Sequence, residues 1–489
     1  MAELSFPAAL AFHVERDPHH VAIVHEDRSV TRRQLHDRAT ERARRMLGDG
    51  VGVGDLVVIR LPNGIEFFEA VVAAWMIGAV PLPLSARLTA AEFDAVLAVA
   101  DPATTIDGAR PPSADPPPEG IGVDLADVVS PHWKAIATGG STGTPKVVVD
   151  QRPALADPLQ PVTFMRVDGV QLVAGPLYHS GPFINAVNGL LSGATLVVMG
   201  RFDASLALEL IERHRVDWAL LVPTMQLRIW RLGAERRRRA DMSSLRVVMS
   251  SGGAYPAWLK AEMIAWLGAD RIYEAYGGTE LLGGTFITGA EALEHPGSVG
   301  RCRPDCLMRI LDDDGTEVAP GEVGQVWFAR RDGRPTYAYL GTEDRREGSW
   351  GSFGDLGHVD ADGYLYLADR RTDMIVTGAV NVSPAEVEAA VESHPSVRSC
   401  VVIGLADDEL GQRVHAIVDV GASSDALGES HSELIEALAA HVGGLLSSAK
   451  RPRTWELVAE PLRDDAGKVR RAALRAERER ERGAGTAQS

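Results

Sequence analysis

Cysteine is scarce in this chain of 489 residues, which contains only Cys302, Cys306 and Cys400. An odd and sparse set of cysteines does not build a disulfide framework, so the composition fits a reducing compartment and predicts a cytoplasmic location. The spacing of Cys302 and Cys306 would suit metal ligands, but no second pair of Cys or His residues lies at a matching distance. We therefore expect ordinary thiols rather than a metal site.

Positive charge and long apolar runs are also lacking. The formal net charge is −17, which disfavours non-specific binding to nucleic acids and to anionic membrane surfaces. The most apolar stretch, residues 71–84, is interrupted by Gly78, Pro81 and Pro83, and it is too short to cross a bilayer. No basic segment followed by an apolar one opens the sequence, so we expect neither a signal peptide nor membrane insertion.

The length supports two or more domains. Residues 55–61, 65–77 and 79–84 have the patterns of a strand, a helix and a strand. This β-α-β order predicts a layered α/β domain, and residues 171–290 repeat the alternation. Within them, the basic run 236–239 lies near a helix end and predicts a solvated terminus, while docking of an anionic partner such as the nucleotide of CoA is the less favoured interpretation.

The second half of the chain changes character twice. Residues 297–369 carry short alternating strands and Asp-Gly turns, which predict a small β-barrel or a distorted sheet. From about Arg370 a small α+β pattern follows, in which Ser383-Pro384-Ala385-Glu386 reads as a capping box that opens a helix. The tail 475–482 predicts an exposed, fraying helix. We expect an N-terminal domain of residues 1–369, barrel-like from about 295, and a small C-terminal domain of residues 370–489.

The most distinctive stretch is a loop between two short strand-like segments. It contains Thr138-Gly139-Gly140-Ser141-Thr142-Gly143-Thr144-Pro145-Lys146. Its glycines let the backbone N–H groups approach anionic oxygens, its hydroxyls add donors, and Lys146 adds a mobile positive charge. The run therefore predicts a cradle for a polyphosphate.

Two other interpretations of this loop were weighed. The P-loop of nucleotide hydrolases needs Gly-Lys followed by Ser or Thr and then by a helix, whereas here Pro145 precedes the lysine and a strand-like run of valines follows it. A surface hairpin rich in turn residues is the more ordinary alternative. The order of the residues is more specific than such a hairpin requires.

The run resembles the phosphate loop of the adenylate-forming superfamily, which comprises acyl- and aryl-CoA synthetases, peptide-synthetase adenylation domains and luciferases. The resemblance covers nearly the whole chain. It implies that a carboxylic acid and ATP form an acyl-adenylate and pyrophosphate, after which the small C-terminal domain rotates and a thiol accepts the acyl group. ATP, Mg²⁺ and CoA are the implied cofactors, and the implied phosphate-loop residues are Thr138, Gly139, Gly140, Ser141, Thr142, Gly143 and Lys146.

A second motif supports the same resemblance. It is Tyr276-Gly277-Gly278-Thr279-Glu280, and a carboxylate after a tight glycine turn suits Mg²⁺. The resemblance implies that Tyr276 stacks on adenine, that Thr279 meets the α-phosphate and that Glu280 is the metal ligand, with Thr279 and Glu280 counted among the catalytic residues. The other implied nucleotide contacts are Gly252, Gly253, Ala254, Glu274 and Gly277.

Two further positions complete the implied nucleotide site. Asp355, in Gly354-Asp355-Leu356-Gly357, resembles the aspartate that accepts both ribose hydroxyls, and Arg370 resembles an arginine that contacts ribose and phosphate. Lys468 stands where the family keeps its catalytic lysine. One ammonium there would offset the charge that builds when a carboxylate attacks the α-phosphate.

The resemblance also implies an acyl pocket, a thiol tunnel and a hinge. The expected pocket residues are His179, Phe183, Tyr255, Gly278, Gly283 and Gly284, of which the last two are expected to leave room for a bulky acid. A lone histidine such as His179 would more often be structural. The tunnel residues are Gly378 and Ala379, and the hinge residues are Thr372 and Asp373. Thr372 and Ala379 depart from the residues usual in the family, so adenylation is better supported than thioester formation.

The leading hypothesis is an AMP-forming acid–CoA ligase. No carrier domain follows Lys468 in the sequence, which favours free CoA as the acceptor. Within the superfamily the motifs most resemble the bile-acid and steroid-acid CoA ligase branch, which favours a bulky terpenoid or steroid acid. The alternatives are a stand-alone enzyme that loads a separate carrier protein and a non-catalytic protein that binds nucleotide or acyl-adenylate. A homodimer is compatible with the sequence.

Overall fold

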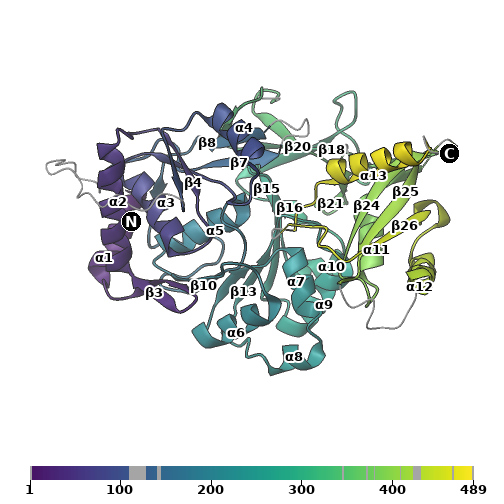
Figure 1. Ribbon diagram of the computed structural model, residues 1–489, viewed down its shortest axis with the longest axis horizontal. Coiled ribbons are helices and arrows are strands. Elements are labelled where there is room, and N and C mark those ends of the chain that lie inside the picture. The colour runs from purple at the N-terminus through teal and green to yellow at the C-terminus, as the bar shows by residue number, and fades with distance from the viewer. Residues whose placement is uncertain are drawn as a thin grey trace.

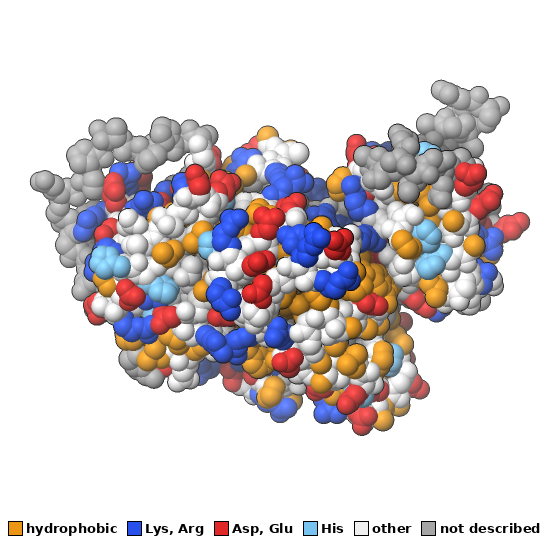
Figure 2. Space-filling model, turned by 90° about the horizontal axis from the view of Figure 1, so that it is seen from below, with side chains coloured by type: hydrophobic (Ala, Val, Ile, Leu, Met, Phe, Trp, Pro, Cys, Tyr) orange, Lys and Arg blue, Asp and Glu red, His pale blue; other side chains and the backbone are white. Residues whose placement is uncertain are grey.

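The structure is a computed structural model that describes residues 3–108, 128–139, 145–343, 346–370, 373–378, 380–407, 409–421, 431–464 and 467–486. The chain forms a large body and a smaller C-terminal lobe, which lies at the right in Figure 1. Figure 2 shows the same two parts side by side from below, with acidic and basic side chains intermixed over the larger body. This arrangement confirms the expected α/β class, with a large N-terminal and a small C-terminal part.

One sheet of 13 strands runs through the body. Its order is β17 (Cys306–Leu311), β18 (Gly324–Arg330), β20 (Trp350–Val359), β21 (Tyr364–Arg370), β16 (Gly300–Cys302), β15 (Gly284–Thr288), β14 (Ile272–Gly277), β13 (Val247–Ser250), β12 (Trp218–Leu220), β10 (Val170–Val173), β11 (Thr195–Val198), β2 (Val21–His25) and β3 (Arg28–Thr31).

Six neighbouring strands of this sheet, β2, β11, β10, β12, β13 and β14, pair in parallel. Parallel strands need crossover connections, and helices α5 (Ser180–Leu191), α6 (Ala204–His214), α7 (Pro223–Trp230), α8 (Ala234–Arg239) and α9 (Ala257–Leu267) provide them. The carboxyl ends of all six strands therefore meet at one edge of the sheet. Ligands of open α/β sheets bind outside this edge.

Among the described residues, the body has three smaller sheets. They are β19 (Tyr337–Leu340) with β8 (Pro145–Asp150) and β7 (Ala135–Gly139), β5 (Val80–Pro83) with β4 (Leu56–Arg60) and β6 (Thr104–Asp107), and β1 (Leu4–Ser5) with β9 (Leu155–Ala156). The remaining body helices are α1 (Phe6–Arg16), α2 (Arg32–Gly48), α3 (Ile65–Met76), α4 (Ala90–Ala100) and α10 (Gly289–Glu294).

Helix α3 and strands β4 and β5 confirm the predicted β-α-β order at the start of the chain. Every residue of α3 except Glu66 is buried, because its sequence is apolar on all sides, as expected of a helix that lies inside a core. Phe67, Phe68 and Trp75 of this helix have 1% exposure or less and belong to the largest apolar cluster.

Of the small barrel and the distorted sheet expected for residues 297–369, the hydrogen bonding of the described strands corresponds to the sheet. Strands β16, β17, β18, β20 and β21 extend the large sheet beyond β15, and β19 instead joins β8 in the sheet that holds the glycine-rich hairpin. The reason is that β16 pairs on both edges, with β15 and with β21, so the segment remains continuous with the central sheet.

The C-terminal lobe has a sheet of its own. It contains β23 (Val380–Val382), β22 (Ile375–Thr377), β25 (Gly411–Asp419), β24 (Ser399–Asp407) and β26 (Thr454–Val458), together with α11 (Pro384–Glu392), α12 (His431–Leu445) and α13 (Arg471–Thr486). Helix α11 starts as predicted, because the Ser383 hydroxyl accepts from the Glu386 backbone N–H and Pro384 occupies its first turn.

The exposed tail expected for residues 475–482 agrees with the structure in part: Ala476, Glu477, Glu479 and Arg480 are exposed, whereas Arg475 and Arg478 are half-buried. Just before this tail, Leu474 packs against the apolar residues of β24. Within it, the Arg478 guanidinium donates to both oxygens of Glu456 on β26. The regular Arg-Glu pattern suggested a solvated helix, but the sequence shows no partner for Arg478 because Glu456 belongs to a different element.

Candidate functional site

The glycine-rich loop joins β7 to β8. Residues 140–144 of the predicted cradle, among them Gly140, Ser141, Thr142 and Gly143, lie outside the described residues. The two strands that carry the loop are in register, with Thr138 opposite Lys146 and Gly139 opposite Pro145. This pairing fixes Lys146 at the base of the loop.

Lys146, Glu280 and Tyr339 form one polar cluster at this point. The Lys146 ammonium donates to Oε1 of Glu280 and to the hydroxyl of Tyr339, both at 3.1 Å. The Tyr339 hydroxyl in turn donates to Glu280 Oε1 at 2.7 Å. A carboxylate held beside an ammonium and a hydroxyl can bind a divalent cation together with phosphate oxygens.

Sequence reasoning did not find Tyr339. Burial and the Glu280 carboxylate raise the pKa of this phenol, so it stays protonated and keeps donating. Its strand β19 pairs with β8, and Tyr339 lies opposite Val148, two residues after Lys146. An isolated tyrosine in a segment without a motif gave no signal for this pairing.

Tyr276 and Asp355 form a second polar contact. The Tyr276 hydroxyl donates to Oδ2 of Asp355 at 2.6 Å, and the Tyr276 ring meets Phe353 edge-on. Tyr276 lies near the end of β14, and Asp355 lies on β20. The structure therefore brings together two residues that the sequence assigned to the same nucleotide.

The glycines around this contact lie against packed atoms. A Cβ at Gly278 would lie 2.3 Å from Phe353, one at Gly277 would lie 3.1 Å from the Gly283 carbonyl, and one at Gly284 would lie 2.2 Å from the Tyr276 carbonyl. A Cβ at Gly283 would lie 2.9 Å from Cys306 and 3.0 Å from Phe328. Gly283 and Gly284 thus make room for neighbouring protein rather than for a bulky acid. The expectation drawn from their small size is wrong, because Cys306 and Phe328 of later strands face Gly283, and the Tyr276 carbonyl of β14 faces Gly284.

The backbone beside Glu280 is strained. Leu281 has a φ of 53°, a left-handed conformation that costs a residue with a branched side chain roughly 1 kcal/mol or more. Next to it, Thr336 donates its hydroxyl to the Glu280 carbonyl at 2.7 Å. Thr279 and Glu280 are partly exposed in this turn, so their side chains can meet a ligand.

Two buried hydroxyls have no hydrogen-bond partner among the residues that the structure describes, one on the strand beside Lys146 and one at the carboxyl end of β13. They are Oγ1 of Thr138 and Oγ of Ser250. Ser250 ends β13, and the exposed residues Gly252, Gly253 and Ala254 follow it. Unpaired buried hydroxyls next to exposed backbone N–H groups fit a ligand rich in hydrogen-bonding oxygens, such as a nucleotide.

Glu274 and Tyr255 have partners inside the protein. The Glu274 carboxylate is buried and pairs with Lys260 of α9, and Lys260 also donates to the Ser298 carbonyl. The Tyr255 hydroxyl donates to Gln226. These contacts hold α9 and α7 against the sheet, and they give Glu274 a structural role beside the nucleotide contact expected for it.

His179 and Phe183 lie at the start of α5, after the carboxyl end of β10. Phe183 is fully buried and stacks on Trp133 at 6.2 Å between ring centroids, so it contributes to the core. His179 is half-buried, and burial lowers its pKa. Its Nε2 lies 3.6 Å from Oδ2 of Asp464 in the C-terminal lobe.

The segment that carries Lys468 is packed on the body. A Cβ at Gly467 would lie 2.6 Å from the hydroxyl of Thr224 at the start of α7. The Lys468 charge also lies close enough to His179 to lower the pKa of that histidine. Because α5 and α7 follow β10 and β12, the structure places Lys468 at the carboxyl edge of the parallel strands.

The expected hinge and tunnel residues are only partly described. Thr372 and Ala379 lie outside the described residues, as does the side chain of Arg370. Asp373 pairs with Arg471 at 3.5 Å. Gly378 has a φ of 59°, and its N–H donates to the Leu410 carbonyl. In this arrangement Gly378 therefore belongs to a turn of the C-terminal lobe.

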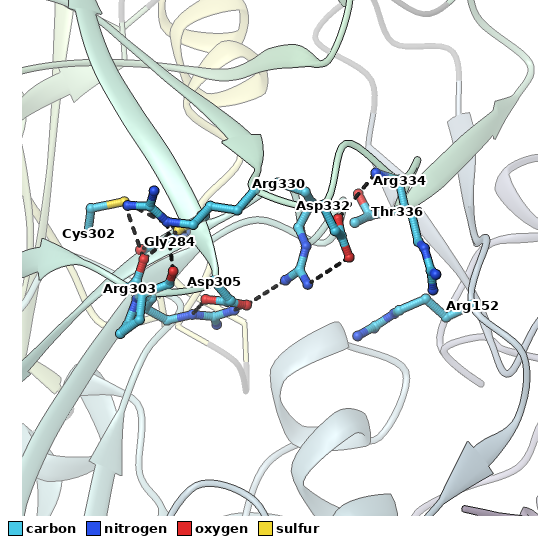
Figure 3. Close-up of polar contacts among 12 residues, drawn as sticks. Arg152, Gly284, Cys302, Arg303, Asp305, Arg330, Asp332, Arg334 and Thr336 are labelled. Carbon is cyan, nitrogen blue, oxygen red and sulfur yellow. Dashed lines mark hydrogen bonds and ion pairs between the residues drawn. The ribbon is translucent and has the colours of Figure 1, made fainter.

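Figure 3 shows Cys302 next to a chain of ion pairs, and Cys306 is its hydrogen-bond partner. Their sulfur atoms are 3.3 Å apart, and this hydrogen bond lowers the pKa of Cys306. Asp305 pairs with both Arg303 and Arg330. Over the described ranges, no group of three or more His, Cys, Asp and Glu side chains could hold a metal ion.

The basic run of α8 is largely engaged within the protein. Arg237 has 8% exposure and lies 3.5 Å from the centre of the Trp230 ring. Arg236 pairs with Glu209, and Arg239 pairs with Glu235. Three of the four arginines therefore have partners within the protein, and an anionic ligand is not needed to explain them.

Comparisons with known proteins agree with this geometry. A family model described as AMP-binding enzyme matches residues 10–130 and 135–337, and one described as AMP-binding enzyme C-terminal domain matches residues 386–468. The chain is 31% identical to a feruloyl-CoA synthase of Amycolatopsis over 435 residues, which cover 82% of this chain and 86% of the relative. It is 29% identical to a fatty acid–[acyl-carrier-protein] ligase of Streptomyces coeruleorubidus over 512 residues, 95% of each chain.

The fold also matches solved structures. The o-succinylbenzoate CoA synthetase of Bacillus subtilis, in complex with an acyl-adenylate intermediate, superposes with a TM-score of 0.79 at 24% identity, over 97% of this chain and 98% of the other. Helices long and apolar enough to span a bilayer do not occur in the described part of the chain.

Proposed function

The chain belongs to the AMP-binding enzyme family as an AMP-forming acyl-CoA synthetase, and we propose that it joins a carboxylic acid to CoA in two steps at the edge described above. The acid carboxylate first attacks the α-phosphate of ATP, which forms acyl-AMP and releases pyrophosphate. The CoA thiol then attacks the acyl carbon, loses its proton, and releases AMP. The position of Lys468 at the carboxyl edge of the parallel strands carries this proposal.

The two polar clusters suit different parts of the nucleotide. Tyr276 and Asp355, which share a 2.6 Å hydrogen bond, suit the adenosine, with the Asp355 carboxylate accepting from ribose hydroxyls. Lys146 suits the phosphates, and the orphaned hydroxyls of Thr138 and Ser250 support a ligand rich in oxygens. Bound Mg²⁺ would neutralise phosphate charge, and Glu280 is the carboxylate placed to hold it.

Lys468 has a separate task in the first step. Two anions meet when the carboxylate approaches the α-phosphate, and an ammonium that contacts both lowers the barrier more than it stabilises the separated reactants. The contacts of its segment with Thr224 and His179 support an arrangement suited to adenylation. The second step then requires residues 370–489 to turn relative to residues 1–369 about the hinge at Thr372 and Asp373, with Gly378 and Ala379 moving to the thiol.

The nature of the acid is best argued from the relatives. Feruloyl-CoA synthase and indoleacetate–CoA ligase carry names that refer to acids with an aromatic ring. The polycyclic terpenoid or steroid acid was favoured by the resemblance of the motifs to one branch of the superfamily and by the small size of Gly283 and Gly284. The relatives reported above are not named for such an acid, and the two glycines are backed by Cys306, Phe328 and Tyr276. We therefore propose an aryl or arylalkyl carboxylic acid.

A second acceptor is favoured by one observation. A relative that aligns over 95% of this chain is named for ligation to an acyl carrier protein, so a carrier protein is the alternative to CoA.

Mass spectrometry of the products tests both proposals. The protein is incubated with ATP, Mg²⁺ and a panel of aryl, fatty, sterol and diterpenoid acids, with CoA, with a carrier protein, or with neither. An acyl-CoA product from an aryl acid supports the proposal, while acyl-AMP that passes only to the carrier protein favours the alternative. If no acid yields acyl-AMP, the proposed function is wrong.

A further inference from the structure

The segment that carries Lys468 contacts the body on both sides of the lysine. Four residues before Lys468, Asp464 faces His179 at 3.6 Å. Two residues after it, Arg470 donates to Oε1 of Glu92 in α4 at 2.8 Å. In Figure 1 the yellow chain that precedes α13 reaches from the smaller lobe toward the body.

We propose that Glu92 and Arg470 are positioning residues for the first half-reaction: their ion pair, together with the contact of Asp464 with His179, brackets Lys468 and holds it at the carboxyl edge of the sheet. The inference rests on the proposed function for its catalytic meaning. Its structural part, that these two residues meet in one state of the protein, stands by itself.

Glu92 is built to hold its carboxylate still. It is the third residue of α4 and belongs to a capping box with Thr89. Its Oε2 accepts from the Thr89 backbone N–H at 3.0 Å and from the Thr89 hydroxyl at 3.1 Å. Its Oε1 is the atom that faces Arg470. One oxygen thus anchors the side chain to its own helix, and the other is presented to the C-terminal lobe.

The charge on Glu92 is secured in the same way. The Thr89 backbone N–H and the Arg470 guanidinium lower the pKa of Glu92. The start of a helix also favours a negative charge. The carboxylate is therefore ionised at neutral pH and ready to pair.

The two carboxylate oxygens of Asp464 likewise have different partners. Its Oδ1 accepts from the Lys468 backbone N–H at 2.8 Å, which closes the turn that presents the lysine. Its Oδ2 is the atom nearest His179. On both sides of Lys468, one carboxylate oxygen thus organises its own segment while the other contacts the opposite part of the protein.

A third contact lies farther from the lysine. The Arg231 guanidinium, directly after α7, donates to the carbonyl of Glu392, the last residue of α11, and to that of Arg398, directly before β24. Last-turn carbonyls of a helix lack partners within the helix. Arg231 thus caps α11 from the body and supports the same placement of the lobe.

An exposed ion pair adds little to the stability of a folded domain. The Arg470 side chain is 78% exposed and that of Glu92 is 37% exposed, so their pair is of this kind. Here the pair can still affect the rate, because it joins two parts of the protein whose relative placement must change during the proposed cycle. A small bias in such an equilibrium changes the fraction of protein that is ready for adenylation.

The first test is a double-mutant cycle with Glu92→Gln, Arg470→Gln and both together. Gln is also accepted in a capping box, so Glu92→Gln removes the charge and keeps the cap. Each single variant is expected to form acyl-AMP about two- to fivefold more slowly, as suits an exposed pair, and the double variant should be no slower than the singles. Transfer from supplied acyl-AMP to CoA should not slow. Asp94→Asn, an exposed position on the same helix, is the control and should change neither step.

Additive effects of the two substitutions, or equal losses in both half-reactions, would overturn the positioning role. A chemical cross-link gives a second readout that does not depend on activity. Glu92→Cys combined with Arg470→Cys, treated with a short bismaleimide, should yield a cross-linked product by mass spectrometry, whereas either single variant should not.

The cross-linked protein should still form acyl-AMP but lose transfer to the thiol. Transfer of the acyl group to the thiol at the full rate in the cross-linked protein would overturn the positioning role of Glu92 and Arg470. Failure of the two cysteines to cross-link would also overturn it. A wild-type protein that makes no acyl-AMP from any acid would instead refute the proposed function, while the cross-link would still report whether the two residues meet.

Discussion

Nζ of Lys146 lies 3.1 Å from Oε1 of Glu280, although 134 residues separate them in the sequence. Lys146 lies on a strand of a three-stranded sheet, and Glu280 follows the last parallel strand of the large sheet. Tyr339 joins the two sheets by contacting both side chains. The ammonium, the carboxylate and the phenol form one unit, and substitutions of its members should not act independently.

Lys468→Ala should slow acyl-AMP formation by about 100- to 1000-fold, as is typical when one preorganised charge contact in a transition state is lost. Transfer from supplied acyl-AMP to CoA should remain close to wild type, because the proposed turn of residues 370–489 takes the lysine out of the site before that step. Hydroxylamine trapping of acyl-AMP and a thioester assay measure the two steps. Lys450→Ala removes the same side chain at an ion pair with Glu386 within the lobe and should affect neither. Equal loss in both steps would contradict the rotation of the C-terminal part.

Tyr339→Phe should reduce the rate of acyl-AMP formation by about tenfold while the fold is retained. The ring stays in place, but Glu280 loses a 2.7 Å hydrogen bond and Lys146 loses an acceptor, and hydrogen bonds to charged groups are worth about 1.5–3 kcal/mol. The rate is measured at several Mg²⁺ concentrations, because a loosened Glu280 should raise the concentration required. Tyr366→Phe, which removes a hydroxyl bonded to Asp360, is the matched control. If the Mg²⁺ dependence is unchanged, Tyr339 does not contribute to Mg²⁺ binding through Glu280.

Asp355→Asn should raise the KM for ATP and leave the KM for the acid near its wild-type value. The substitution keeps the size of the side chain and removes the negative charge that accepts from Tyr276. Steady-state kinetics with each substrate varied in turn measure the effect. Asp362→Asn changes an exposed turn near the same strand and should alter neither KM. An unchanged KM for ATP in Asp355→Asn would remove this residue from the ribose site.

Gly283→Ala should destabilise the protein by about 1–3 kcal/mol, the range for overpacking a core. The added methyl would lie 2.9 Å from Cys306 and 3.0 Å from Phe328. Gly444→Ala in α12 is the control, since nothing lies within 4 Å of its Cβ position and alanine favours a helix. Thermal unfolding should therefore move in opposite directions for the two variants. A Gly283→Ala protein of wild-type stability would show that space does exist at this position.

His13 should make the fold sensitive to mild acid. Burial, opposed by a hydrogen bond to the Leu191 carbonyl, lowers the pKa of His13 to about 4 from an ordinary 6.5. Above pH 6.5 the group is neutral in both states and has no effect. As the pH falls from 6.5 to 4, only the unfolded state takes up the proton, so the folded state loses up to about 3 kcal/mol.

His13→Gln should remove this contribution. Its free energy of unfolding should fall less than that of the wild type between pH 7 and pH 5, as measured by urea unfolding. His19→Gln, at an exposed position of the following turn, should behave like the wild type. Parallel pH profiles for His13→Gln and the wild type would contradict the assignment.

The sequence predicted the parts of the molecule that depend on local pattern. The helix at α3 follows from an apolar run that only Glu66 and Glu69 interrupt, and the start of α11 follows from Ser383 and Pro384. Lys146, Glu280, Tyr276 and Asp355 could be selected together because each stands in a motif that resembles the adenylate-forming superfamily.

What the sequence could not predict depends on partners from distant elements. Tyr339 became visible only through the pairing of β19 with β8. The space beside Gly283 was misjudged because Cys306 and Phe328 come from later strands. Arg470 and Glu92 are 378 residues apart, and neither is part of a motif. Such contacts are set by the placement of one element on another, which local periodicity does not encode.

The two oxygens of the Glu92 carboxylate bind different parts of the protein, and this limits which amino acids position 92 can accept during evolution. Oε2 caps its own helix, and Oε1 meets Arg470. A reversal of the pair, with lysine at 92 and glutamate at 470, would restore the attraction between opposite charges but leave the Thr89 N–H without its acceptor. In a library of all single substitutions, position 470 should therefore accept lysine, while position 92 should accept little besides glutamate and, at some loss of activity, glutamine.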